Sequence, residues 1–156
     1  MSGPFPKFRT LVVRPTLEEL GMWSPAAENL VYGTALTESG LAYLQQRGGG
    51  PALGLWQMEP ATFNDIRVYL VRRHDLAAKV MPMALEQPLQ PSEIVYNLKL
   101  ACAMCRIHYW RVEEKLPAAN DLAGLGAYWK RYYNTELGKG EVLDFQTRGR
   151  QILKGD

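Results

Sequence analysis

Glu38 is the residue of this sequence whose placement best suits acid–base chemistry. An apolar stripe at spacings of three and four residues precedes it, formed by Ala27, Leu30, Val31 and Thr34. Glu38 comes four residues after Thr34, so on a helix it continues this stripe toward the core. A carboxyl group against apolar surface loses hydration, which raises its pKa and keeps it protonated nearer to neutral pH. We therefore expect Glu38 to be able to serve as a general acid.

The helix that would hold Glu38 has a recognisable beginning. Ser24 can accept hydrogen bonds from the free N–H groups of a first turn, and Pro25 suits the first helical position. We expect this helix to run from Pro25 to about Ser39. The glycine-rich stretch 45–51 that follows predicts a flexible loop.

Two separate motifs resemble the lytic transglycosylase and goose-type lysozyme group. Thr37-Glu38-Ser39-Gly40, a glycine-rich gap and then Gly54-Leu55-Trp56-Gln57-Met58-Glu59-Pro60-Ala61-Thr62 are similar to that group's Glu-Ser, variable gap and Gly-Leu-Met-Gln-x-x-Pro-x-Thr. Further on, Tyr132-Tyr133-Asn134-Thr135-Glu136-Leu137-Gly138 resembles its Tyr-Asn-x-x-Gly segment, with one additional residue before the glycine. Together the motifs frame roughly residues 24–140.

This chain also differs from that pattern at three points. Gly40 stands where the group usually has an aromatic residue, two positions after the glutamate. The run Gly48-Gly49-Gly50-Pro51-Ala52-Leu53 replaces the usual Ser and Gly-Ala, and Trp56 replaces a methionine. These differences bear on the shape of a cleft more than on its acid.

The resemblance implies a mainly α, lysozyme-like single domain over residues 16–156. It leaves room for a small β-hairpin near residues 47–58. Residues 1–15, which hold three prolines, are expected to form an extended N-terminal arm. Glu38 would be catalytic, and the substrate-binding residues implied are Ser39, Gly54, Leu55, Gln57, Tyr133 and Asn134. Tyr133 would approach the glutamate, and Gln57 would offer a donor and an acceptor to a sugar or its N-acetyl group.

The activity implied is that of a peptidoglycan lytic transglycosylase with no cofactor and no metal. Such an enzyme cleaves the MurNAc–GlcNAc β-1,4 bond and leaves a 1,6-anhydro-MurNAc end. Glycoside hydrolysis ordinarily uses two carboxyl groups. A transglycosylase needs one, because the muramoyl C6 hydroxyl takes the place of an activated water.

Three other functions stay open. In a hydrolytic muramidase, Glu59, Asp65 or Asp75 would have to act as the base. A virion structural or wall-binding protein would keep the fold without catalysis. A nucleic-acid-binding module would use the aromatic and basic cluster Trp129–Tyr133, although a net charge of only +2 does not call for nucleic acid as a partner.

The composition is that of an ordinary globular domain, with 156 residues, 47% hydrophobic and 22% charged. Cys102 and Cys105 lie three residues apart on a predicted helix, which favours small buried residues over a disulfide. His108 continues this spacing, but no fourth ligand is evident, so we expect no metal site and a hydrogen-bonded histidine instead.

The remaining helices are predicted from periodicity and from proline and cap positions. We expect them to begin at Pro60, around Asp75, at Glu93 after a Ser92 cap, at Asn120 or Asp121, and at Glu141. The helix over residues 93–114 should be the longest and the most deeply buried.

The first ten residues lack the apolar core of a signal peptide, and no run of about 18 apolar residues occurs. We therefore expect no membrane insertion and synthesis in the cytoplasm. A protein that acts on the bacterial cell wall in the periplasm would then reach it through a holin or inside a virion. Both routes are typical of phage-encoded proteins.

Overall fold

The computed structural model describes residues 5–135 and 138–154, and within these ranges the chain is helical with no β-strand. The α-helices are α1 (Arg14–Leu20), α2 (Pro25–Glu38), α3 (Pro60–Val71), α4 (His74–Val80), α5 (Leu98–Trp110), α6 (Leu122–Trp129) and α7 (Val142–Leu153). Shorter turns are the π-helical η1 (Arg9–Val13) and η4 (Lys130–Asn134), and the 3₁₀ turns η2 (Met81–Met83) and η3 (Pro91–Val95). The prediction of a mainly α protein is confirmed.

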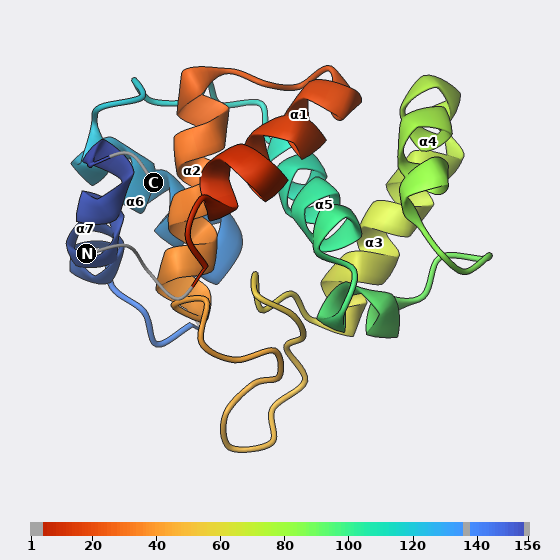
Figure 1. Cartoon of the computed structure of the whole chain (residues 1–156), viewed down its shortest axis with the longest axis horizontal. Helices are drawn as coiled ribbons and strands as arrows, with labels where there is room; N and C mark the ends of the chain where they lie inside the picture. Colours follow the sequence, from red (N-terminus) through yellow and green to blue (C-terminus); the bar gives the residue numbers. More distant parts are fainter. Residues whose placement is uncertain (1–4, 136–137, 155–156) are drawn as a thin grey trace.

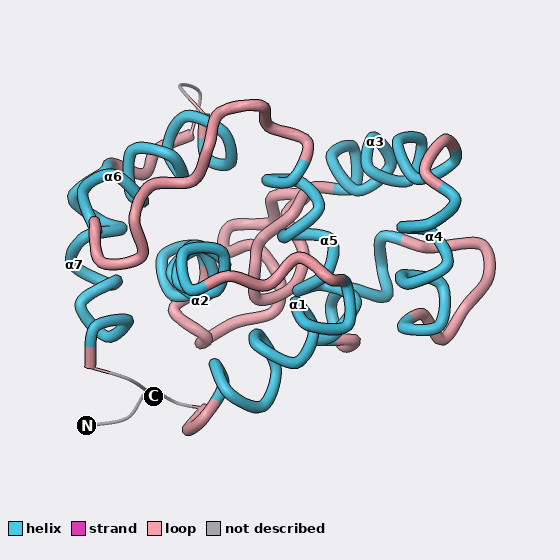
Figure 2. Tube along the Cα trace, turned by 90° about the horizontal axis from the view of Figure 1, so that it is seen from above, coloured by secondary structure: helices cyan, strands magenta, loops and turns pink. Residues whose placement is uncertain are grey.

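Helix α2 passes through the middle of the molecule. Helices α6 and α7 lie on one side of it, α1 and α5 on the other, and α3 and α4 lie beyond α5 (Figures 1 and 2). The side chains of α2 are buried on every face from Ala27 to Leu36. A Cβ atom at Gly33 would overlap the ring of Phe145, so the glycine lets α7 pack directly on α2.

The limits of α2 agree with the sequence-based prediction. The hydroxyl of Ser24 accepts a hydrogen bond from the backbone N–H of Ala27 at 3.0 Å, and Pro25 occupies the first turn. The helix ends at Glu38, and Gly40 then takes a positive φ of 63°. Glu38 is thus the last helical residue.

The prediction of an extended N-terminal arm is wrong for the part of the arm that the structure describes. The chain is helical from Arg9 through η1 and α1 to Leu20, and Phe8 and Val13 are buried in the core. The ring centroid of Phe8 lies 5.6 Å from that of Trp56. Proline did not prevent a helix here, because Pro15 falls in the first turn of α1, directly after the wider π turn. Residues 1–4 of the predicted arm lie outside the described part.

Helix α5 is shorter than the helix predicted over residues 93–114, and with 13 residues it is not the longest, since α2 has 14. Helix α5 begins at Leu98 rather than Glu93, with Asn97 as its cap, and the preceding residues form η3. Glu93 is fully buried, and its carboxylate accepts hydrogen bonds from the backbone N–H groups of Leu85 and Glu86 and from the amide of Asn97. Since Glu93 faces this loop, the chain turns before α5 begins.

The glycine-rich segment between α2 and α3 forms a long loop below α2 (Figure 1). It contains two isolated β-bridges, Gln45 with Leu53 and Leu53 with Met58, and no strand forms there. The hairpin considered for residues 47–58 is therefore reduced to single bridges.

Helix α5 carries both cysteines, which are buried and unpaired as the sequence predicted. Within the described residues, no three side chains of His, Cys, Asp or Glu are grouped so that they could hold a metal ion. None of the helices in the described ranges has the length and apolar character needed to cross a lipid bilayer.

Candidate active site

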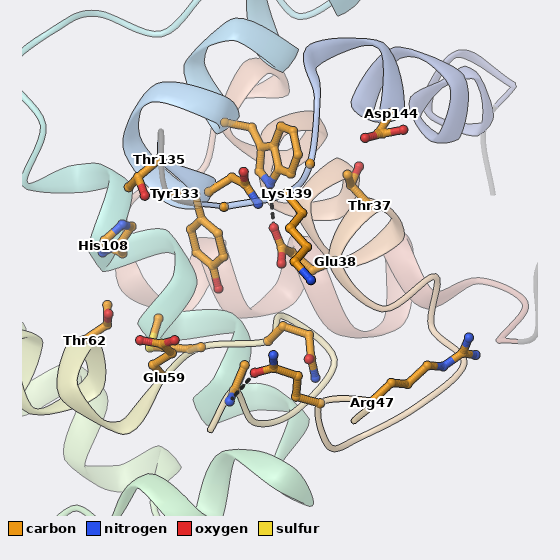
Figure 3. A pocket seen from close by; sticks show the side chains of 18 of the residues that line it. Thr37, Glu38, Arg47, Glu59, Thr62, His108, Tyr133, Thr135, Lys139 and Asp144 are labelled. Carbon is orange, nitrogen blue, oxygen red and sulfur yellow. Dashed lines mark hydrogen bonds between the residues drawn. The ribbon is translucent and has the colours of Figure 1, made fainter. Parts of the chain in front are cut away.

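A cleft of about 820 Å³ lies where the end of α2, the glycine-rich loop, the beginning of α3 and the segment after α6 meet. Its polar lining residues include Thr37, Glu38, Tyr43, Gln46, Arg47, Gln57, Glu59, Thr62, His108, Tyr133, Asn134, Thr135, Lys139, Asp144 and Arg148. The sequence-predicted residues Glu38, Gln57, Tyr133 and Asn134 are thus brought together. Figure 3 shows Glu38 on one wall of the cleft, with Glu59 and Thr62 across from it.

The carboxyl group of Glu38 has two identified donors. The indole Nε1 of Trp129 donates to Oε2 at 2.9 Å (Figure 3), and the side chain of Asn134 also forms a hydrogen bond with it. Burial raises the pKa of Glu38 to about 7, against the opposing effects of these two hydrogen bonds and the charge of Lys130. A carboxyl with this pKa exchanges a proton readily at neutral pH.

The backbone around Glu38 is fixed by the neighbouring loop. The hydroxyl of Tyr43 donates to the carbonyl of Glu38 at 2.8 Å. Ser39 is buried, and its hydroxyl donates to the carbonyl of Leu55 at 2.6 Å. Ser39 and Leu55 therefore lie behind the cleft wall and join α2 to the loop, and neither is among the lining residues.

Gly54 also lies behind the cleft wall and is not a lining residue. It has a positive φ of 77°, and a Cβ there would come within 2.5 Å of the carbonyl oxygen of Ile94. The close approach that glycine allows is thus to the backbone of η3. Gln57 does face the cleft, with its side-chain nitrogen donating to the Gly54 carbonyl at 2.9 Å.

Tyr133 lines the same cleft as Glu38, and its hydroxyl forms a hydrogen bond with the neighbouring loop. It donates to the carbonyl of Trp56 at 2.6 Å, and the described contacts include no hydrogen bond from Tyr133 to Glu38. Its ring stacks on Tyr109 at 5.5 Å and meets His108 edge-on at 5.2 Å. Tyr133 therefore joins η4 to the loop, and the hydrogen bonds to the Glu38 carboxyl come from Trp129 and Asn134.

Trp129 and Lys130 lie beside Glu38 but were not among the site residues predicted from the sequence. Both belong to the aromatic and basic cluster Trp129–Tyr133, which the sequence associated with a nucleic-acid-binding alternative. Trp129 is 1% exposed, and its one polar side-chain atom points at Glu38. Burial of the ring is a signal that an N–H group needs a partner, but the sequence does not say which one.

The other carboxylates of the cleft differ from Glu38. Glu59 precedes α3, and no described side chain donates a hydrogen bond to it. Asp144 accepts from the backbone N–H of Glu141 at 2.7 Å and so caps α7. Asp65 and Asp75 are not lining residues, and Asp75 lies 3.8 Å from Arg73. Of the three bases considered for hydrolysis, only Glu59 reaches the cleft.

His108 is hydrogen-bonded, as expected from its position on α5. Its Nε2 lies 2.7 Å from the carbonyl oxygen of Tyr132, and its Nδ1 lies 2.9 Å from Arg111. Burial lowers the pKa of His108, which favours the neutral ring. Both ring nitrogens already have partners in the protein, so this histidine is poorly suited to act as a metal ligand.

No protein family, curated protein or solved structure matches this chain. The cleft and its carboxyl group are therefore interpreted from their own geometry. They define a mainly helical protein with one strongly perturbed acid in a concave site, which is the combination expected of a catalytic centre.

Proposed function

We propose that this protein is a peptidoglycan lytic transglycosylase that cleaves the MurNAc–GlcNAc β-1,4 bond and leaves 1,6-anhydro-MurNAc ends. The observation that carries the proposal is Glu38 itself, with a pKa of about 7 at the wall of an 820 Å³ cleft. A volume of this order falls in the range of about 300–1,000 Å³ that ligand sites occupy. The Glu-Ser and Gly-Leu-x-Gln motifs supply the substrate class.

The Glu38 carboxyl acts twice in the reaction, first as an acid and then as a base. Protonated Glu38 gives its proton to the glycosidic oxygen as the bond to C1 breaks and positive charge develops on the sugar ring. The resulting carboxylate then takes the proton of the muramoyl C6 hydroxyl while that oxygen bonds to C1. The enzyme ends in its starting state, and no water enters the products.

The two donors on Glu38 suit this cycle. The N–H groups of Trp129 and Asn134 stabilise the carboxylate that exists between the two proton transfers. Burial favours the protonated form that begins the reaction. Since these effects oppose one another, the proton can leave and return at nearly equal free energy near pH 7.

The charges at the cleft suit a substrate that carries carboxylates. Arg47, Lys139 and Arg148 line it, and in the described part of the chain none of them forms an ion pair. The peptide stems of peptidoglycan bear carboxylates that such cations can meet. We propose glycan strands with attached stems as the substrate, reached through a holin or from a virion.

A hydrolytic muramidase is the second candidate, and the observation that favours it is Glu59 on the opposite wall (Figure 3). Glu59 would activate a water, and the product would then carry a reducing end. A nucleic-acid-binding function has less support, because Tyr128 and Trp129 are buried and the faces of their rings are not available for stacking on bases.

The test is mass spectrometry of purified peptidoglycan after digestion by the wild type, Glu38→Gln and Glu59→Gln. We expect anhydro-muropeptides from the wild type and Glu59→Gln, and a loss of about 10²–10⁴-fold in Glu38→Gln. Reducing-end products that disappear in Glu59→Gln would establish the hydrolase instead. No products from a folded wild type would overturn both enzymatic proposals and favour a structural or wall-binding role.

A further inference from the structure

Lys130 makes two contacts beside Glu38 that the proposed reaction does not use. It is half-buried at the beginning of η4, and its Nζ donates to Oδ1 of Asn134 at 2.8 Å and to the carbonyl of Gly138 at 3.0 Å. Among the residues that the structure describes, no carboxylate forms an ion pair with it. Both partners of this cation are therefore neutral oxygens at the edge of the cleft.

The first contact determines which end of the Asn134 amide faces Glu38. An ammonium group only donates hydrogen bonds, so the amide oxygen of Asn134 must point at Lys130. The amide NH₂ is then left for Glu38, with which Asn134 is hydrogen-bonded. Without Lys130 the amide could turn over, because a protonated carboxyl can equally donate to an amide oxygen.

We infer that Lys130 is a positioning residue for Glu38. By holding the oxygen of Asn134 it keeps the amide NH₂ on the carboxyl, and by holding Gly138 it ties the segment after η4 to the same point. The inference concerns the proton on Glu38, so it can be tested without a substrate. Only its catalytic consequence rests on the proposed function.

The expected direction follows from the groups around Glu38. The amide NH₂ of Asn134 and the positive charge of Lys130 both favour the carboxylate and lower the pKa of Glu38. The other described titratable groups that face it or line the cleft are Cys105, Tyr109 and Tyr133, and Tyr43, Arg47, Glu59, His108, Lys139, Asp144 and Arg148. Burial raises the pKa of the thiol and of both phenols well above the usual values, so these three stay neutral while Glu38 titrates.

The probe is the indole N–H of Trp129, whose hydrogen bond to Oε2 makes its ¹H–¹⁵N resonance sensitive to the Glu38 proton. The chain has only four tryptophans, so the signal is assigned by its absence in Trp129→Phe, and Glu38→Gln should abolish its titration. In the wild type we expect a midpoint near 7. Lys130→Met keeps the aliphatic stem and should move the midpoint upward by roughly one unit.

Arg131→Met is the matched control. It removes the same charge one residue away, from an exposed side chain whose guanidinium lies over the Tyr132 ring at 5.3 Å. Because no described hydrogen bond joins the Arg131 side chain to Asn134, its loss should leave the midpoint unchanged. Lys130→Leu, which also lacks a donor, serves as a second variant if Lys130→Met does not fold, which thermal unfolding will show.

A double-mutant cycle with Asn134→Ala separates positioning from charge alone. If Lys130 acts through the amide, the shift in the double variant is smaller than the sum of the two single shifts. An equal sum, or an unchanged midpoint in folded Lys130→Met, overturns the inference. A wild type without activity on peptidoglycan would refute the proposed function and leave this titration result standing.

Discussion

The indole nitrogen of Trp129 lies 2.9 Å from Oε2 of Glu38, which joins the end of α6 to the end of α2 across 91 positions of sequence. The contact brings a fully buried donor to the most perturbed carboxyl of the cleft. It also places the acid between two helices that α7 holds together, since Phe145 packs on Trp129 and fills the notch at Gly33.

Replacing Trp129 by Phe should weaken catalysis without emptying the core. The phenyl ring keeps most of the packing against Phe145 but loses the N–H donor to the carboxylate. A hydrogen bond to a charged group contributes about 1.5–3 kcal/mol, so the rate on peptidoglycan should fall roughly tenfold or more. Initial rates across pH will also show the pKa of Glu38 moving upward.

Trp110→Phe is the control for this change, since Trp110 is 43% exposed and is not a lining residue of the cleft. Its pH profile should match that of the wild type. Equal rates for Trp129→Phe and the wild type would mean that the indole contact has no part in the reaction.

The stability of the protein should depend on pH through Glu38. Its pKa is about 7 in the folded state and 4.5 as the ordinary value, so between these limits the folded state holds more protons than the unfolded chain. Its contribution to stability is fully present below about pH 4.5 and is lost as the pH rises through about 7. The loss is at most about 3 kcal/mol.

Urea unfolding of the wild type and Glu38→Gln at several pH values measures this effect, because the amide does not titrate and the other groups are shared. The variant should gain stability relative to the wild type as the pH rises from 4.5 to 8. Two curves that stay parallel over that range would show that Glu38 is not perturbed in the folded state.

Gly54→Ala should destabilise the protein more than Gly49→Ala, although both glycines have a positive φ, of 77° and 85°. At Gly49 an added Cβ meets nothing within 4 Å, whereas at Gly54 it meets the carbonyl of Ile94 at 2.5 Å. The backbone cost is common to both, and the overlap should add about 2 kcal/mol at Gly54. Unfolding free energies of the two variants check the difference, and equal values would contradict the packing of this loop on η3.

Arg148→Glu should reduce cleavage of stem-bearing peptidoglycan more than cleavage of glycan from which an amidase has removed the stems. The expected cause is repulsion between the new carboxylate and the carboxylates of the stems. Arg150→Glu, on an exposed position of the same helix outside the cleft lining, is the matched control. An equal loss of activity on both substrates would mean that Arg148 affects binding of the glycan or the stability of the fold, and not binding of the stems.

Local signals in the sequence located the helix that matters most. Ser24 and Pro25 predicted the beginning of α2, and the spacing from Thr34 placed Glu38 against the core at its end. These predictions depend only on residues that belong to the same helix or directly precede it. Pro60 likewise predicted the beginning of α3, and α7 begins at Val142, one residue after the predicted Glu141.

Contacts between segments that are distant in the sequence could not be predicted from such local signals. A motif placed Tyr133 near Glu38, and both line the same cleft, but the motif did not predict that the Tyr133 hydroxyl would donate to the backbone carbonyl of Trp56. The N-terminal segment was expected to be extended because of its prolines. Phe8 and Val13 are nevertheless buried, and their burial depends on the rest of the core. In each case the deciding partner lies far away in the chain.

Because Cys102 and Cys105 are buried, a fluorescent dye can be attached selectively to a cysteine introduced elsewhere. They are the only cysteines of the chain, both are 0% exposed, and burial raises their pKa above the usual value, so neither should compete for a thiol-reactive dye. A cysteine introduced at exposed Ala61, next to the lining residue Thr62, would then carry a single fluorophore at the mouth of the cleft. Glycan fragments could be ranked by fluorescence with the natural thiols left in place.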